Sequence, residues 1–413
     1  MTTPDDDVRA RLDVIVRRGR GRLVADLVRR LGAGRLDLAE DVAQDALAAA
    51  IAAWPFRGVP DNPEAWLFQA ARNRALDRLR RETRETAYAE ETDDRGDGVE
   101  RAPIDDPELR LIFLCCHPAL DEKSALCLTL KIVDGFTARE TAGVFLEPET
   151  ATAQRLARAK RALRDAADGV AETPSRFEIA ARAPRALKVV YLMFALGYAP
   201  RAGERALRRD VASEALRLAR VLADHPLTKR PEAAALAALL SFQASRFEAR
   251  ESAEGAIVLL KDQDRALWDG ALIRQGLAYL EPARTGEAVS RYHLEAGVAA
   301  THATARSFEA TDWPSILTLY ETLLTLTPSP VAMANAAAAR AAAGDPTGAL
   351  EALDALSDEK ALATYAPYHI ARADALERLG RAADAGTAYA AALEAGPPAP
   401  VVEHLEGRLA AFE

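Results

Sequence analysis

Hydrophobic residues recur three and four residues apart through most of the N-terminal part of the chain, and this spacing is typical of amphipathic helices. Gly32-Ala33-Gly34 ends the first of these segments, Asp37 is placed to cap the second, and Pro55 is expected to stop it. The stretch 55–63 is rich in Pro, Gly and Asn, which predicts a loop. The pattern therefore predicts three helices before the first polar stretch, at residues 8–31, 37–54 and 64–84.

Residues 134–164 predict two helices joined by a tight turn at Leu146–Glu149, where the fixed φ of Pro148 suits the start of a helix. The inner side of the first helix is expected to carry Phe136, Ala142, Val144 and Phe145. In the second helix Leu156, Ala159 and Leu163 face inward, and the remaining positions include Arg155, Arg158, Lys160, Arg161 and Arg164. A helix-turn-helix with a basic second helix is the geometry that places side chains in a DNA major groove. The alternative is an ordinary helical hairpin with a solvated basic face.

The character of the chain changes at about residue 174, beyond which helices rich in Ala and Leu follow one another. The segment 312–398 resembles a tetratricopeptide array, because two turn glycines, Gly344 and Gly380, lie 36 residues apart. Residues at the expected spacings of such a unit are Ala385, Tyr389, Ala392 and Pro397, with Tyr320, Leu323 and Pro328 in a preceding unit. A generic alanine-rich helical bundle is the alternative.

Composition supports an all-α fold, since Ala is abundant and aromatic residues make up only 6% of the 413 residues. The formal net charge of −9 does not suggest a nucleic-acid binder, but the charges are segregated along the chain. Residues 72–84 hold six arginines, whereas residues 85–108 hold ten acidic residues and two arginines. The second stretch is polar and contains glycine, so residues 85–106 are predicted to form an acidic flexible linker.

Cys115, Cys116 and Cys127 form no C-x-x-C pair, and apolar residues precede the first two. We therefore favour buried structural thiols over a metal site and expect neither a metal nor another cofactor. The sequence has no signal-like apolar segment and no apolar run long enough for a membrane span, so a cytoplasmic protein is expected. Nor does it contain a recognisable catalytic constellation, and we expect a protein that is not an enzyme.

The order of these features resembles the extracytoplasmic-function sigma factors of RNA polymerase. The residues that carry the resemblance are Asp41–Asp45, Phe56–Gly58, Trp66-Leu67, Ala71–Asn73 and Arg155–Arg161. Three further segments look like a subgroup with a long tetratricopeptide-containing extension: Leu109–Leu120, Val190–Tyr198 and Leu259–Arg265. The resemblance implies sigma region 2 at 8–84, the linker at 85–106, a region 4 helix-turn-helix at 107–170 and the helical extension at 174–413.

The resemblance also implies roles for individual residues. Asp41, Gln44 and Asp45 share one helix face, which in the family docks on the β′ clamp of the polymerase. The loop at 55–63 and the helix after it are expected to handle the promoter −10 element, since an opened strand offers bases for capture and stacking. The −10 candidates are Phe56, Arg57, Trp66, Asn73, Arg74, Arg80 and Arg81. For Trp66, core packing is at least as good an interpretation as base contact.

The second helix of the helix-turn-helix is expected to enter the major groove at the −35 element. Its N-terminal part can reach base edges, so Thr152, Gln154, Arg155 and Arg158 are the candidates for sequence readout. Lys160, Arg161 and Arg164 are expected to contact phosphates, which position the protein without specifying sequence.

These features predict a sigma factor that directs core RNA polymerase, through the β′ clamp and the β flap, to promoter DNA. The extension is expected to regulate activity, and whether it takes a protein or peptide partner is left open. A DNA-binding transcription regulator with a sensing repeat domain is the alternative function. A scaffold dominated by its repeats is a third hypothesis, and it predicts no salt-sensitive DNA affinity.

Overall fold

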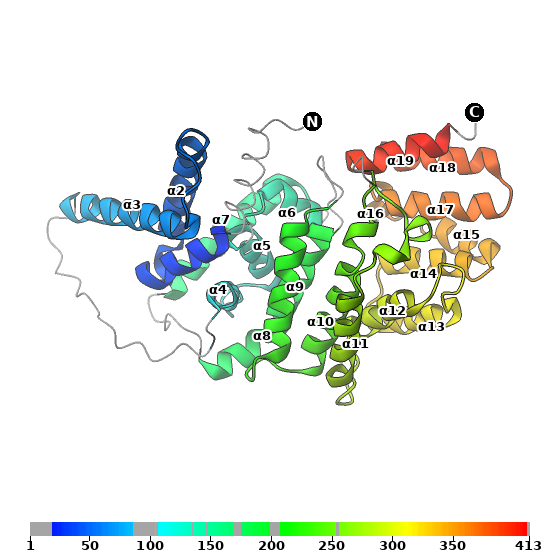
Figure 1. Ribbon diagram of the computed structural model, residues 1–413, viewed down its shortest axis with the longest axis horizontal. Coiled ribbons are helices and arrows are strands. Elements are labelled where there is room, and N and C mark those ends of the chain that lie inside the picture. The colour runs from blue at the N-terminus through cyan, green and yellow to red at the C-terminus, as the bar shows by residue number, and fades with distance from the viewer. Residues whose placement is uncertain are drawn as a thin grey trace. The chain divides into compact units, whose positions relative to one another are not determined.

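The computed structural model describes residues 19–85, 104, 106–133, 135–145, 147–167, 175–198, 207–252 and 256–410. These residues are almost entirely helices and turns (Figure 1), and their one extended pairing is an isolated antiparallel bridge between Glu251 and Ile257. The predicted all-α fold is confirmed. The chain forms two compact units, Met1–Val189 and Val190–Glu413, which are described separately. Most of the predicted acidic linker lies outside the described residues.

Unit 1 begins with a described helical stretch at 19–31, followed by η1 (Ala33–Arg35), α2 (Leu36–Arg57) and α3 (Pro63–Glu85). The predicted cap at Asp37 is wrong, because Arg35 holds the N-cap position and Asp37 lies in the first turn of α2. The predicted stop before Pro55 is also wrong. Helix α2 continues to Arg57 and ends at Gly58, whose φ of 80° is left-handed and whose amide donates to the Trp54 carbonyl.

The second part of unit 1 contains α4 (Pro107–Cys115), α5 (Glu122–Ile132), α6 (Ala138–Phe145) and α7 (Glu149–Ala167). Asp106 and Asp121 cap α4 and α5 by accepting hydrogen bonds from the backbone amides of Leu109 and Ser124. Predicted inward-facing residues of the helix-turn-helix are buried, namely Phe136, Ala142, Leu156, Ala159 and Leu163. Phe145 is half-buried, and the side chain of Val144 lies outside the described set.

The three cysteines are free and buried, as the prediction of structural thiols requires. Burial raises the pKa of Cys116 to about 12 and that of Cys127 to about 11. Both thiols are therefore protonated at neutral pH.

Helix α8 (Arg176–Tyr198) carries the division between the two units. Arg182 is buried and donates to the Phe113 carbonyl at 3.0 Å, while Arg185 donates to the carbonyls of His117 and Leu120. These bonds fasten the first half of α8 to the end of α4 and to the turn after it. Unit 1 consequently extends to Val189, beyond the boundary predicted at residue 174.

Unit 2 continues with helices whose bounds are α9 (Arg209–Asp224), α10 (Pro231–Ala244), α11 (Gly270–Ala283), α12 (Arg291–Thr304) and α13 (Trp313–Leu326). Between α10 and α11 lie three short 3-10 turns, η2 (Phe247–Ala249), η3 (Leu260–Asp262) and η4 (Arg265–Leu267). Helix α10 is apolar along most of its length and is buried on nearly all sides, packed against α9, α11 and α12. It forms the centre of the first part of unit 2.

The last part of unit 2 is a set of helical hairpins made of α14 (Pro330–Ala342), α15 (Pro346–Asp354), α16 (Lys360–Ala363), α17 (Ala366–Arg378), α18 (Ala382–Glu394) and α19 (Ala399–Leu409). Helix α14 begins at Pro330 and α17 at Ala366, 36 residues later, and α15 and α18 have the same offset. Gly344 and Gly380 occupy the equivalent turns with φ of 98° and 72°, which glycine adopts without steric cost.

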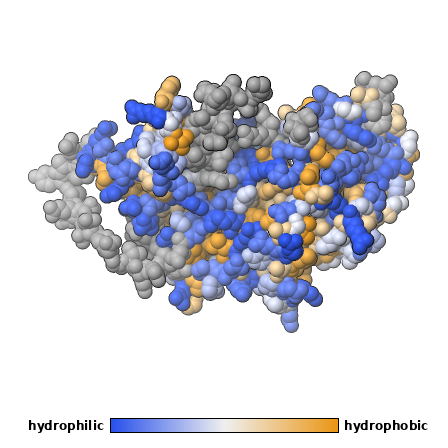
Figure 2. All heavy atoms as spheres, viewed as in Figure 1, coloured by the Kyte–Doolittle hydropathy of each residue, from blue (hydrophilic) through white to orange (hydrophobic). Residues whose placement is uncertain are grey.

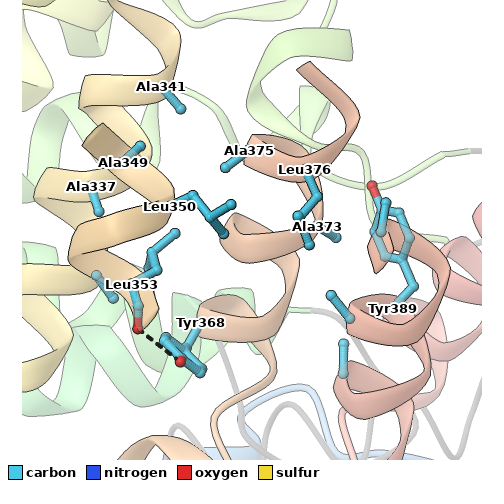
Figure 3. Packing of buried hydrophobic residues seen from close by; sticks show 14 of the residues in the cluster. Ala337, Ala341, Ala349, Leu350, Leu353, Tyr368, Ala373, Ala375, Leu376 and Tyr389 are labelled. Carbon is cyan, nitrogen blue, oxygen red and sulfur yellow. Dashed lines mark hydrogen bonds between the residues drawn. The ribbon is translucent and has the colours of Figure 1, made fainter. Parts of the chain in front are cut away.

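Small residues allow these hairpins to pack closely. Figure 3 shows alanines from α14, α15 and α17 facing Leu350, Leu353 and Leu376, with Tyr389 of α18 beside them. The Tyr368 hydroxyl donates to the Leu353 carbonyl at 3.0 Å and joins α17 to α15. On the face shown in Figure 2, hydrophilic residues cover most of the described surface, and hydrophobic residues form scattered patches.

Candidate nucleic-acid interface

The acidic face of α2 presents Asp41, Gln44 and Asp45, all exposed, as the helical spacing predicted. The opposite face of α2 is buried through Val42, Ala43, Ala46, Leu47 and Ala50. Arg78 of α3 bridges the two acids, at 3.1 Å from Asp41 Oδ2 and 2.8 Å from Asp45 Oδ2. This bridge, which no local sequence pattern predicts, fixes the acidic face relative to α3.

Two aromatic residues near the end of α2, Trp54 and Phe56, differ in their exposure. Phe56 is 90% exposed, and Arg57 beside it is exposed too, whereas Trp54 is fully buried. Trp66 of α3 is half-buried and meets the Trp54 ring edge-to-face, with centroids 5.3 Å apart. Trp66 thus packs on the core with part of its surface left accessible. Its surroundings therefore fit both interpretations made from the sequence, core packing and base contact, in part.

An open groove of about 520 Å³ follows one side of α3. It is lined by Trp66, Gln69, Ala70, Asn73, Arg74 and Asp77. Three of the predicted −10 residues, Trp66, Asn73 and Arg74, therefore line one surface. Gln69, which the sequence did not single out, donates its amide to Asn73 Oδ1 at 3.2 Å and holds that side chain at the groove. Arg80 and Arg81 are exposed further along α3.

The turn before α7 is organised by Glu147, a residue that sequence reasoning passed over. Its carboxylate accepts hydrogen bonds from Lys123 Nζ at 2.5 Å, Thr152 Oγ1 at 2.9 Å and Arg155 Nη2 at 3.3 Å. The hydrogen bond from Lys123 is the main reason that the pKa of Glu147 lies below its usual range. The charged carboxylate therefore joins α5 to the first turns of α7.

This arrangement corrects one candidate for base readout. Thr152 is fully buried and its hydroxyl is committed to Glu147, because it lies on the same helix face as Leu156 and Ala159. Its side chain is not offered to a base edge. Arg155 is half-buried against the same carboxylate, whereas Gln154, Arg158 and Arg161 are exposed on the outer side of α7.

Lys160 and Arg164 of α7 are held by acidic residues of α2. Lys160 Nζ lies 2.6 Å from Glu40 Oε2 and 3.0 Å from Asp37 Oδ1, and Arg164 also pairs with Asp37. Burial opposes the charge of Lys160, but the bonds to Glu40 and Asp37 outweigh it and raise the pKa of Lys160. In this conformation the ammonium that was predicted to meet phosphate is bound to carboxylates instead.

Glu40 is the centre of this network, which we call the α2–α7 clasp and define as Asp37, Glu40, Lys160 and Arg164. The Glu40 side chain is 5% exposed and also meets Arg20 at 3.1 Å and Lys131 at 3.8 Å. Its partners thus come from the 19–31 helix, from α5 and from α7. Removing the cationic partners of a buried carboxylate is costly, because its charge is then left without compensation.

Comparison with known proteins identifies the N-terminal part of the chain. Residues 18–85 match the family model for sigma-70 region 2, and residues 182–284 match a family of unknown function, DUF6596. An uncharacterized protein of Rhizobium meliloti (strain 1021) is 40% identical over 364 residues, which cover 86% of this chain and 85% of that protein. No solved structure matches the chain.

The chain belongs to the family of that rhizobial protein and carries a sigma-70 region 2 domain. The domain supports a sigma factor that acts in transcription initiation, with core RNA polymerase and promoter DNA as partners. The acidic face of α2, Phe56 and the α3 groove all lie within the matched residues. Helix α7 lies outside both family matches.

Two further features concern metal ligands and membrane-spanning helices. Within the described residues, His, Cys, Asp and Glu side chains nowhere gather in a group that could hold a metal ion. In the same part of the chain, no helix combines the length and the hydrophobicity that crossing a membrane requires.

Proposed function

We propose that this sigma factor is of the extracytoplasmic-function type, that region 2 and the α6–α7 helix-turn-helix read the two promoter elements, and that the helical extension regulates them. The observation that carries the proposal is the layout of region 2. One exposed acidic face lies on α2, and a groove with an aromatic wall and an amide lies on α3. These are the surfaces that docking on a protein and capture of an unpaired base require.

The acidic face is assigned to the β′ clamp of the polymerase. Asp41 and Asp45 are 61% and 47% exposed while being paired with Arg78, so the carboxylates remain open to a basic partner. Rim charges of this kind set the rate and register of association.

The α3 groove is assigned to the −10 element. Trp66 offers an accessible ring surface, and the Asn73 amide stands where it can read a base edge. Phe56 and Arg57 lie at the end of α2, where the loop begins. There the Phe56 ring can stack on a base and the Arg57 guanidinium can bind a phosphate. Stacking on an aromatic side chain contributes about 1–3 kcal/mol per base, which helps to offset the cost of unpairing.

The outer side of α7 is assigned to the −35 element through Gln154, Arg155 and Arg158, with Arg161 as a phosphate contact. Lys160 joins them only when the α2–α7 clasp opens, since Glu40 and Asp37 otherwise occupy its ammonium. We infer that the free protein keeps α7 held against α2 and that core polymerase separates them. The β flap would then hold the second domain at the spacing of the promoter elements.

The hairpins from α14 to α19 are interpreted as tetratricopeptide-like repeats. Their 36-residue offset, the turn glycines and the buried positions Ala385, Tyr389 and Ala392 support this interpretation. Stacked hairpins offer a continuous surface to a protein or peptide, which fits a regulatory role.

Charge reversal on α2 tests the proposal. The double variant Asp41→Lys/Asp45→Lys is expected to lose binding to core polymerase and run-off transcription while the fold is retained, because exposed ion pairs contribute at most about 1 kcal/mol each. Arg78→Gln is the matched control, since it breaks the same two ion pairs and leaves the carboxylates in place. Equal polymerase binding by the wild type and the double variant would overturn the assignment.

A further inference from the structure

A cluster of arginines lies between α10 and α12 in unit 2, away from every residue assigned above. Arg246 follows α10, Arg250 follows η2, and Arg265 begins η4. Each of the three residues is half-buried. The structure brings together three segments that stand apart in sequence, because Tyr198 contacts Arg250 and Gln263 contacts Arg246.

The cluster is built around one indole ring. The guanidinium carbons of Arg265 and Arg246 lie 4.6 Å and 5.3 Å from the centroid of Trp268, which is buried. Arg246 also donates to Gln263 Oε1 at 3.0 Å, and Gln263 in turn donates to the Val258 carbonyl. Arg250 lies over the Tyr198 ring at 4.0 Å. Aromatic rings and amides therefore hold the guanidinium groups in place.

The positive charge of this cluster is not neutralised by described acidic residues. Arg209, which donates to the Phe247 carbonyl, has ion pairs to both Glu248 and Glu251, whereas Arg246, Arg250 and Arg265 form none with the described part of the chain. Burial and the nearby charges of Arg250 and Arg265 lower the pKa of Arg246, as expected for a guanidinium beside like charges. Among the described residues, the carboxylate that acts on the charge of Arg265 is Glu309, which is exposed.

Several donors of the cluster are buried without an acceptor among the described residues. They are Arg250 Nε, Arg265 Nη2 and Trp268 Nε1. Arg265 does bond through Nη1 to the carbonyls of His302 and Ala305 at the end of α12, at 2.6 and 2.8 Å. Buried donors normally have acceptors, and a group of them beside like charges is a place where an acceptor of negative charge is stabilised.

We propose that unit 2 binds a compact phosphate-type oxyanion at the site formed by Arg246, Arg250, Arg265 and Trp268. A guanidinium can donate two parallel hydrogen bonds to such a group, and several guanidinium groups favour a dianion over a single carboxylate. The Trp268 ring already carries two guanidinium groups, so it is not free to stack on a base. A phosphate group with little else attached fits these surroundings better than a nucleotide does.

Phosphate binding at this site can be tested with full-length protein and without polymerase or DNA. The result of the test is therefore independent of the proposed function. Inorganic phosphate is titrated against the protein in chloride buffer of matched ionic strength, and thermal unfolding and tryptophan fluorescence are recorded. Pyrophosphate and adenosine monophosphate form parallel titrations that distinguish a free phosphate from the phosphate of a larger molecule. Saturable stabilisation by phosphate or pyrophosphate is expected, with adenosine monophosphate binding no more tightly.

Three variants make the test specific. Arg246→Gln and Arg250→Gln are each expected to weaken phosphate binding at least tenfold, whereas Arg306→Gln, an exposed arginine of the same unit, leaves it unchanged. In chloride alone, Arg246→Gln should unfold at the same temperature as the wild type or higher, because the repulsion is relieved. A purely structural cluster predicts equal loss of stability in both buffers.

Each remaining outcome counts against the site. An unsaturable response of the wild type, or the same phosphate shift in the wild type and in both cluster variants, would overturn the proposal. If Arg246→Gln fails to fold, Arg250→Gln and the wild-type fluorescence titration decide the question in the same way.

Discussion

Replacing Glu40 by Gln is expected to open the α2–α7 clasp. The carboxylate is 5% exposed and meets Lys160 at 2.6 Å, Arg20 at 3.1 Å and Lys131 at 3.8 Å. Two of these three cations belong to the α4–α7 part of unit 1, so most of the interaction joins that part to α2. Glutamine keeps the shape of the side chain and removes its charge.

The magnitude follows from the burial of the site. Removing one partner of a buried ion pair costs about 3–5 kcal/mol, because the other charge is left uncompensated. The remaining contacts of Asp37 with Lys160 and Arg164 are partly exposed, and pairs of that kind contribute about 1 kcal/mol or less. A loss of about 3 kcal/mol favours the open form by roughly a hundredfold, since 1.4 kcal/mol corresponds to a factor of ten.

Hydrogen exchange of the full-length protein measures this opening directly. Residues 149–167 and 36–57 should exchange faster in Glu40→Gln than in the wild type. Affinity for duplex DNA without polymerase, measured by fluorescence anisotropy, should rise and should fall steeply with salt. Asp41→Asn is the control, because it removes one negative charge from the exposed side of the same helix.

Unchanged exchange in α7 together with unchanged DNA affinity would show that Glu40 does not hold α7 against α2. Glu40→Gln is preferable to a Lys160 variant for this purpose, because Lys160 is itself a candidate phosphate contact.

Four further changes have defined expected outcomes. Thr152→Val should lower stability by about 1 kcal/mol in chemical unfolding, since it removes the bond to Glu147, and should leave promoter preference unchanged. Arg158→Ala should instead alter preference at the −35 element in run-off assays with little change in stability, and a reversed pattern would contradict the orientation of α7. Gly380→Ala should destabilise unit 2 by about 1 kcal/mol, because φ of 72° disfavours a Cβ although the space around it is open; equal unfolding midpoints would argue against that backbone conformation. The pKa of His302 is lowered to about 4 by burial and by Arg246 and Arg265, so the unfolded chain binds the extra proton between about pH 6.5 and 4. Stability should therefore be fully present above pH 6.5 and fall by up to about 3 kcal/mol towards pH 4, and His302→Phe should remove that part of the pH dependence measured by chemical unfolding.

Helical periodicity was enough to predict the all-α fold and the exposed face of α2. Apolar residues at regular spacing determine which side of a helix is buried, and Asp41, Gln44 and Asp45 occupy the other side. The same reasoning would have excluded Thr152, because it lies four residues before Leu156 and so on the inner face of α7.

The two ends of α2 were mispredicted for different physical reasons. Asp37 is a good capping residue in isolation, but in the folded chain its carboxylate binds Lys160 and Arg164 from α7. Pro55 lies in the last turn of α2, where a missing amide proton removes a single hydrogen bond and the helix can continue to Arg57.

The contacts that organise the candidate sites were beyond sequence reasoning. Glu40 and Lys160 are 120 residues apart, and Tyr198 and Arg250 are 52 apart, so no local pattern links them. Buried polar residues in an otherwise apolar face are the one available signal, and Glu40 within α2 is an example.

The most direct test of the account is the interaction with core RNA polymerase. Full-length protein is mixed with purified core enzyme, the complex is isolated by size exclusion, and run-off transcription is measured on genomic promoter fragments. For a sigma factor we expect a stable complex and discrete transcripts that disappear with the Asp41→Lys/Asp45→Lys variant. A protein that does not associate with the core enzyme, or that adds no transcript to those of the core enzyme alone, would contradict it.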